Sequence, residues 1–190
     1  MTNRTLVVSI DALITADIPV LKQLPNLGRV MEHASWITDI ECIYPTLTYP
    51  CHATIATGCW PDRTGINNNE IPDFFAKGRM DWYWWREAIQ VPTVVDFARQ
   101  AGLTASTVTW PVMCASGAEY NIGEIWAPRE EDDPTPWFTR ANSPAVAKIF
   151  EANKHMLRWM KTPQMDEFAA KCAADIIRAH RPDLMLLHLS

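Results

Sequence analysis

The sequence lacks the basic excess that is typical of nucleic-acid-binding proteins. It has 17 lysines and arginines against 22 aspartates and glutamates, which gives a formal net charge of −5. A domain that binds the phosphate backbone of DNA or RNA needs a basic surface, so this balance argues against a polymeric nucleic acid as partner. A small nucleotide substrate remains compatible with it.

Signals for secretion and membrane insertion are also absent. The residues Met-Thr-Asn-Arg-Thr are followed directly by an apolar, strand-like run, without the hydrophobic region and small-residue cleavage site of a signal peptide. No segment has the roughly 20 consecutive apolar residues that a membrane-spanning helix needs. We therefore expect a cytoplasmic protein with no membrane partner.

The cysteines show no spacing of paired metal ligands. There are five of them, an odd number: Cys42, Cys51, Cys59, Cys114 and Cys172. Such usage is typical of free thiols in a reducing compartment, which agrees with a cytoplasmic location.

The most informative segment that is present is YPTLTYPCHATIATGCWPDRTGI, residues 44–66. Pro45 and Pro50 bracket a short turn, and Pro50 suits the first position of a helix, where its missing N–H costs nothing. Thr48 then lies at or next to a helix N-terminus, where unpaired backbone N–H groups favour a bound phosphate. The segment predicts a loop that presents a hydroxyl nucleophile for phosphoryl transfer.

A second signal is the apolar, β-branched run of residues 5–12, which contains Asp11 near its end. Runs of this kind are typical of buried parallel strands. Ligands of open α/β sheets bind outside the carboxyl ends of the strands, so Asp11 stands where a metal ligand would be useful. Taken alone, such an aspartate is more often an N-cap or turn residue.

Asp11 and the frame P-T-x-T-Y-P-x-H-x-T-x-x-T-G-x-x-P together resemble the alkaline phosphatase superfamily, in particular its type I phosphodiesterase / nucleotide pyrophosphatase branch. The resemblance implies that Thr48 is the nucleophile and that Asp11 and Thr48 are metal ligands. Its spacing selects Asn69, from three adjacent asparagines at 67–69, as the residue that contacts the phosphoryl oxygens. It further implies two divalent metal ions in the complete enzyme, with zinc expected, and a covalent phospho-threonine intermediate.

Three positions depart from the family pattern, which commonly has glycine, asparagine and histidine where this chain has Ala12, Cys51 and Thr64. None of them removes a group assigned to the chemistry. Cys51 changes the wall beside the nucleophile, so substrate preference does not carry over. His52 is expected to be a buried residue that braces the loop rather than a ligand.

The sequence contains nine tryptophans, and Trp84 and Trp85 belong to a segment that also resembles the family. One hypothesis is that they bind the substrate by forming a cap over the leaving group, because aromatic rings stack on nucleobases. The alternative is that they pack the loop onto the sheet.

Alternation of strand-like and helix-like segments predicts an α/β fold with a mainly parallel sheet flanked by helices, alkaline-phosphatase-like and incomplete at the C-terminus. The expected helices are residues 24–34, 91–101 and 165–180. The expected strands after the first are residues 36–43, 104–110 and 183–190. Residues 111–142 are expected to be irregular, with the acidic run 130–133 in a solvated loop.

The metal ligands pose the main difficulty. Two metals need about three protein ligands each, but only Asp11 and Thr48 have motif support, and the family's later D-x-x-G-H and D-H-G patterns do not occur. We therefore interpret residues 1–190 as the N-terminal part of a single catalytic domain, which binds at most one metal weakly and turns over little or no substrate. The incomplete sheet is expected to expose an apolar edge beside residues 184–189 and to cause self-association.

The leading functional hypothesis is a metal-dependent hydrolase that cleaves phosphodiester or nucleotide pyrophosphate bonds in a small substrate. The residues named above would carry out this reaction. Two alternatives stay open. One is a phosphonoacetate hydrolase or phosphomonoesterase of the same superfamily. The other, from a different class, is a non-catalytic binding module that keeps part of the fold without its metals.

Overall fold

A parallel sheet of four strands, in the order β1-β4-β2-β3, forms the centre of the computed structural model, which describes residues 4–73, 81–158 and 161–190. The strands are β1 (Thr5–Ile10), β2 (Ala105–Val108), β3 (Tyr120–Ile122) and β4 (Leu184–Leu189). All the neighbouring pairs run parallel. The predicted α/β fold with a mainly parallel sheet is confirmed.

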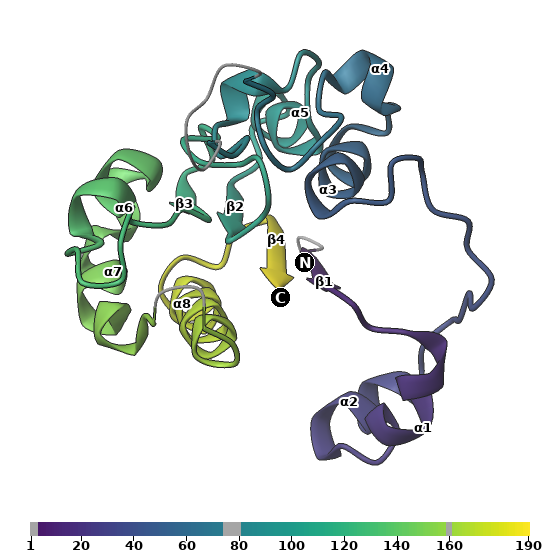
Figure 1. Ribbon diagram of the computed structural model, residues 1–190. Coiled ribbons are helices and arrows are strands. Elements are labelled where there is room, and N and C mark those ends of the chain that lie inside the picture. The colour runs from purple at the N-terminus through teal and green to yellow at the C-terminus, as the bar shows by residue number, and fades with distance from the viewer. Residues whose placement is uncertain (1–3, 74–80, 159–160) are drawn as a thin grey trace.

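Helices cover both faces of this sheet. Figure 1 shows α3, α4 and α5 on one side, α8 on the other, and α6 and α7 beside β3, whereas α1 and α2 lie apart beyond β1. Their bounds are α1 (Ile18–Leu21), α2 (Pro25–Met31), α3 (Thr48–Thr57), α4 (Pro61–Thr64), α5 (Val94–Gln100), α6 (Thr135–Ala141), α7 (Ala147–Asn153) and α8 (Gln164–His180). Within the described ranges, no helix has the length and apolar character needed to cross a bilayer.

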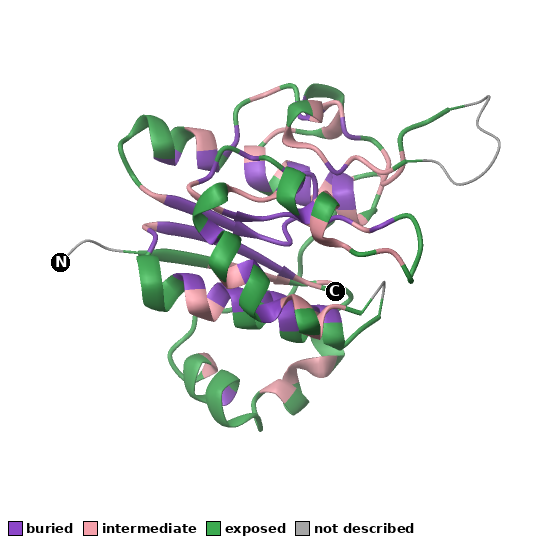
Figure 2. Ribbon diagram, turned by 90° about the vertical axis from the view of Figure 1, so that its left-hand side faces the viewer, coloured by how far each residue is buried: buried purple, intermediate pink, exposed green. Residues whose placement is uncertain are grey.

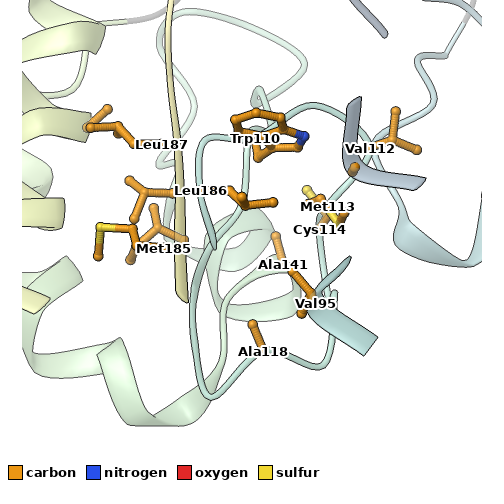
Figure 3. Close-up of a cluster of buried hydrophobic side chains, with 14 of the residues drawn as sticks. Val95, Trp110, Val112, Met113, Cys114, Ala118, Ala141, Met185, Leu186 and Leu187 are labelled. Carbon is orange, nitrogen blue, oxygen red and sulfur yellow. The ribbon is translucent and has the colours of Figure 1, made fainter. Parts of the chain in front are cut away.

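The core is built around β4, which lies between β1 and β2. Figure 3 shows Met185 and Leu187 on one side of this strand and Leu186 on the other, facing Trp110. All three β4 side chains are less than a tenth exposed. A strand that is buried on both faces has a continuous apolar sequence, and this explains the sequence of β4.

The exposed edge of the sheet is β1, and the prediction that placed it beside residues 184–189 is wrong. In the described part of the chain, β1 pairs with β4 alone. Its side chains Leu6, Val8 and Ile10 are 52%, 44% and 37% exposed, and Figure 2 shows this strand as the exposed margin of a buried sheet. The sequence shows that both strands are apolar, but not which of them is central.

The expected helices at 24–34, 91–101 and 165–180 are confirmed as α2, α5 and α8, and the strands at 104–110 and 183–190 as β2 and β4. The expected strand at 36–43 is wrong, because this stretch has no strand partner and leaves Ile37 and Ile40 more than 70% exposed. Residues 111–142 contain an unpredicted strand, β3, and a helix, α6.

Candidate active site

Asp11 follows β1 directly, at the carboxyl edge of the sheet. Its backbone N–H continues the ladder by donating to the Leu189 carbonyl at 2.8 Å. The next residue, Ala12, has a φ of 57°, a left-handed conformation that glycine adopts more easily. The chain therefore turns sharply after Asp11, and its carboxylate keeps 40% of its surface exposed.

Thr48 is the first residue of α3, so this helix begins two residues earlier than Pro50, the predicted start. Pro50 is tolerated at the third position because the first N–H groups of a helix have no partner within it. The Oγ1 hydroxyl of Thr48 donates to Oδ2 of Asp11 at 3.0 Å. Leu47 at the N-cap supplies no side-chain cap, which leaves the positive end of α3 beside this hydroxyl.

Asn69 lies against the same helix start. Its Oδ1 accepts a hydrogen bond from the backbone N–H of Tyr49 at 2.9 Å. The side chain of the neighbouring Asn68 instead accepts from the Asn69 N–H at 2.8 Å. The structure thus brings Asn69, chosen by spacing, together with Thr48 and Asp11.

His52 holds the first turn of α3 in place, as the sequence led us to expect. Its Nδ1 lies 2.7 Å from the Thr48 carbonyl oxygen and therefore donates to it. Nε2 is then an acceptor, and Ser9 Oγ donates to it at 2.9 Å. Burial lowers the pKa of His52, so the ring remains neutral and links β1 to the backbone of Thr48.

His188, in β4, is a second buried histidine at the site. Its Nδ1 lies 3.2 Å from the carbonyl oxygen of Thr109, to which it donates. Its Nε2 has no hydrogen-bond partner and lies 3.9 Å from Oδ2 of Asp11. Burial, with His52 alongside, lowers the pKa of His188 to about 4.

Tyr49 and Glu124 form the wall behind Thr48. Tyr49 is fully buried, and its hydroxyl donates to Oε2 of Glu124 at 3.2 Å. Burial, with a smaller effect of the Asp11 charge, raises the pKa of Glu124 to about 8. Glu124 was missed by sequence reasoning, since it stands alone in a segment that was expected to be irregular.

Trp84 and Trp85 both line an open hollow of about 430 Å³, together with Trp82, Trp126, Trp137 and Arg140 among others. Trp84 is 6% exposed, and its ring packs edge-to-face against Tyr49. Trp85 is half-buried under the guanidinium of Arg140, 4.3 Å from the ring centre. Both tryptophans therefore pack against neighbouring side chains and also present part of their surface to the hollow.

The donor atoms at this site are the Asp11 carboxylate, the Thr48 hydroxyl and the Nε2 atom of His188. Across the described ranges, no three His, Cys, Asp or Glu side chains gather in a way that could hold a metal. However, the Thr48 hydroxyl meets Asp11 at 3.0 Å, and the unpaired His188 nitrogen faces the same carboxylate. Oxygen and imidazole donors suit zinc, manganese or iron.

Comparison with known proteins identifies the family. The model of the type I phosphodiesterase / nucleotide pyrophosphatase family matches residues 5–190. The chain belongs to this family. Venom phosphodiesterase 2 of Crotalus adamanteus is 26% identical over 176 residues, which cover 87% of this chain and 17% of the venom protein. Human ectonucleotide pyrophosphatase/phosphodiesterase family member 1 is 28% identical over 112 residues, 54% of this chain and 11% of that protein.

Solved structures show the same fold. Phosphonoacetate hydrolase from Sinorhizobium meliloti 1021 superposes with a TM-score of 0.67 at 18% identity, covering 98% of this chain and 46% of that one. Murine ectonucleotide pyrophosphatase / phosphodiesterase 5 gives 0.55 at 18% identity and covers 99% and 43%. The chain thus spans less than half the length of the relatives that it matches.

Two of the positions at which the sequence departs from the family pattern, Cys51 and Thr64, can be located in the structure. Cys51 lies in α3, with its Sγ 3.3 Å from that of Cys42. Thr64 is buried in α4, where its hydroxyl accepts from the Ile66 N–H at 3.3 Å.

Proposed function

We propose that the chain is the nucleophile-bearing part of a metal-dependent hydrolase that cleaves phosphodiester or nucleotide pyrophosphate bonds in a small substrate. The observation that carries this proposal is the 3.0 Å contact between the Thr48 hydroxyl and Asp11 at the start of α3. A hydroxyl at an uncapped helix start is well placed to meet a phosphoryl group. Cytoplasmic location, which the free thiols support, is part of the proposal.

In this proposal, Thr48 Oγ1 attacks phosphorus, a bond to threonine forms, and the bond to the leaving alcohol or nucleotide portion breaks. Asp11 orients the hydroxyl as the acceptor of its hydrogen bond. Since Oδ1 of Asn69 is used by Tyr49, its Nδ2 group is the part that would donate to a non-bridging oxygen. Water then hydrolyses the phospho-threonine and restores Thr48.

A free threonine hydroxyl is a poor nucleophile at neutral pH, and a divalent cation would lower its pKa and offset the phosphoryl charge. Asp11 and Thr48 would hold such an ion, with zinc the expected one and His188 Nε2 the nearest additional donor. The ligands of a second ion are not gathered by the described residues. We therefore propose that this chain alone binds at most one ion and has little or no activity.

The hollow beside Trp84 and Trp85 would take the leaving group. Its volume of about 430 Å³ is within the range of small-molecule sites. One observation favours the alternative, a phosphonoacetate hydrolase or phosphomonoesterase: Tyr49, directly after Thr48, is fully buried and packs edge-to-face against Trp82 and Trp84, so its ring offers no open face to a base. A panel of diester, monoester and phosphonate substrates separates these readings.

The deciding experiment is zinc-supplemented hydrolysis of a chromogenic phosphodiester by this chain, its Thr48→Ala variant and its Thr48→Ser variant. Acid-quenched samples are also analysed by mass spectrometry for a phosphoryl group on residue 48. The proposal expects a phosphoryl adduct on threonine that Thr48→Ala abolishes, with turnover slow or absent. Turnover that survives in Thr48→Ala would refute Thr48 as the nucleophile, and a silent panel with no adduct would favour the non-catalytic binding module.

A further inference from the structure

Two cysteine thiols meet beside Thr48. The Sγ atoms of Cys42 and Cys51 lie 3.3 Å apart. Cys51 follows Thr48 by three residues in α3, so the two side chains are neighbours on one helix surface. Cys42 belongs to the segment of residues 32–47 that connects α2 to α3.

The connecting segment is weakly held by the rest of the fold. Figure 1 shows it passing outside the sheet on its way from α2 to α3. It contains no strand, and its side chains Ile37 and Ile40 are 77% and 74% exposed. Its contact with Cys51 is a point at which this segment meets α3.

The two thiols differ in access. Cys42 is exposed, whereas Cys51 is partly buried. An oxidant in solution thus reaches Cys42 first, and Cys51 is positioned to react with the product. Among the other cysteines, Cys114 and Cys172 are buried and Cys59 is partly buried beyond the end of α3.

We propose that Cys42 and Cys51 form an oxidation site, at which an intramolecular disulfide ties residues 32–47 to α3 next to Thr48. The sulfur atoms need to approach by roughly 1.3 Å to reach the length of a disulfide bond, about 2.05 Å. The link would close a short loop and hold the wall beside Thr48 in one arrangement. In a reducing compartment such a bond is transient and responds to oxidants.

The chemistry balances with a peroxide as oxidant. The Cys42 thiolate attacks one peroxide oxygen, so that an S–O bond forms, the O–O bond breaks, and hydroxide leaves. The Cys51 sulfur then attacks the sulfur of the Cys42 sulfenic acid, and water leaves as the S–S bond forms. Two thiols are oxidised by two electrons, and hydrogen peroxide is reduced to two water molecules.

The test counts free thiols in the intact chain. The wild type, Cys42→Ser, Cys51→Ser and the matched control Cys59→Ser are treated with hydrogen peroxide, denatured, alkylated and weighed by mass spectrometry. We expect the alkylated thiols of the wild type to fall from five to three, and those of Cys59→Ser to fall by the same number. Cys42→Ser and Cys51→Ser are expected to form no intramolecular disulfide.

Reduction before alkylation should restore the full thiol count, and oxidation should protect residues 32–47 from proteolysis. The proposal is overturned if the wild type loses the Cys42 thiol alone and keeps its other four thiols under conditions that convert Cys42 to a sulfenic acid. Equal loss in Cys42→Ser, or covalent dimers as the main product on a non-reducing gel, would also overturn it. Circular dichroism of each serine variant checks that the fold is retained.

Discussion

At the scale of single residues, Asn69 differs from its two asparagine neighbours because its side chain accepts a hydrogen bond from the start of α3. Replacement Asn69→Ala leaves the Tyr49 N–H without its partner, and we expect the free energy of unfolding to fall by about 1 kcal/mol. Asn67, which is exposed, serves as the control, and Asn67→Ala should change it by less than about 0.5 kcal/mol. Urea unfolding of both variants measures the difference. A larger loss of stability in Asn67→Ala than in Asn69→Ala would show that the wrong asparagine was assigned to the site.

Glu124 predicts a dependence of stability on pH. Burial raises its pKa from 4.5 to about 8 in the folded chain. Between these two pH values, the folded state therefore holds a proton that the unfolded state has released. Its contribution to stability is therefore present below pH 4.5 and lost as the pH rises through 8. The wild type should lose up to about 1.4 kcal/mol per pH unit across this window relative to Glu124→Gln, which retains an acceptor for Tyr49.

The measurement is urea unfolding of the wild type and Glu124→Gln at several values between about pH 4 and pH 9. Glu87→Gln, which removes an exposed carboxylate, is the control and should follow the wild type. If the wild type and Glu124→Gln stayed parallel at every pH, the carboxyl group of Glu124 would not be neutral in the folded chain.

At the scale of elements, β1 is the strand that determines whether the chain associates. Self-association is still a prediction, but its site moves from β4 to the edge of β1, where Leu6 and Val8 are exposed. Unpaired, apolar edge strands pair with other chains, and a lysine on the edge prevents this. Sedimentation should show oligomers of the wild type that Leu6→Lys and Val8→Lys dissociate.

Val20→Lys is the matched control for this experiment, because Val20 is 62% exposed but lies in α1, away from the edge. It should leave the oligomers intact. A wild type that sediments as a monomer at high concentration, or a Val20→Lys variant that dissociates as fully as Val8→Lys, would count against association through β1.

At the scale of the whole molecule, the two halves of the candidate site come from opposite ends of the chain. Asp11 and Thr48 lie in the first 50 residues, while His188 stands in β4. We expect the chain to bind at most one zinc ion, weakly, and Asp11→Asn to reduce the affinity at least tenfold, since it removes the charged ligand. Asp62→Asn, at an exposed position in α4, is the control.

Competition with a chromogenic chelator measures the affinity, and elemental analysis after dialysis gives the stoichiometry. His188→Gln should weaken zinc binding less than Asp11→Asn does, because the histidine is the more distant donor. Two tightly bound ions per chain would contradict the prediction and would mean that ligands come together that the described residues do not gather.

Sequence alone determined the class of fold, and it selected the residues near the N-terminus that we propose to carry the chemistry. Asp11, Thr48 and Asn69 were selected by resemblance to a family motif whose parts are local in the chain: the end of an apolar strand, a proline-bracketed helix start and a fixed spacing after it. The helices α2, α5 and α8 were predictable for the same reason, because the period of apolar residues is a local property.

Tertiary structure alone decided which strand is central, which histidine faces Asp11 and which cysteines meet. The order β1-β4-β2-β3 sets β4 in the core and β1 at the edge, although both strands read as apolar runs. Residues 36–43 alternate like a strand but have no neighbour to pair with, and Glu124 reaches Tyr49 across 75 positions. Strand order and such contacts depend on packing between distant segments, which no local pattern specifies.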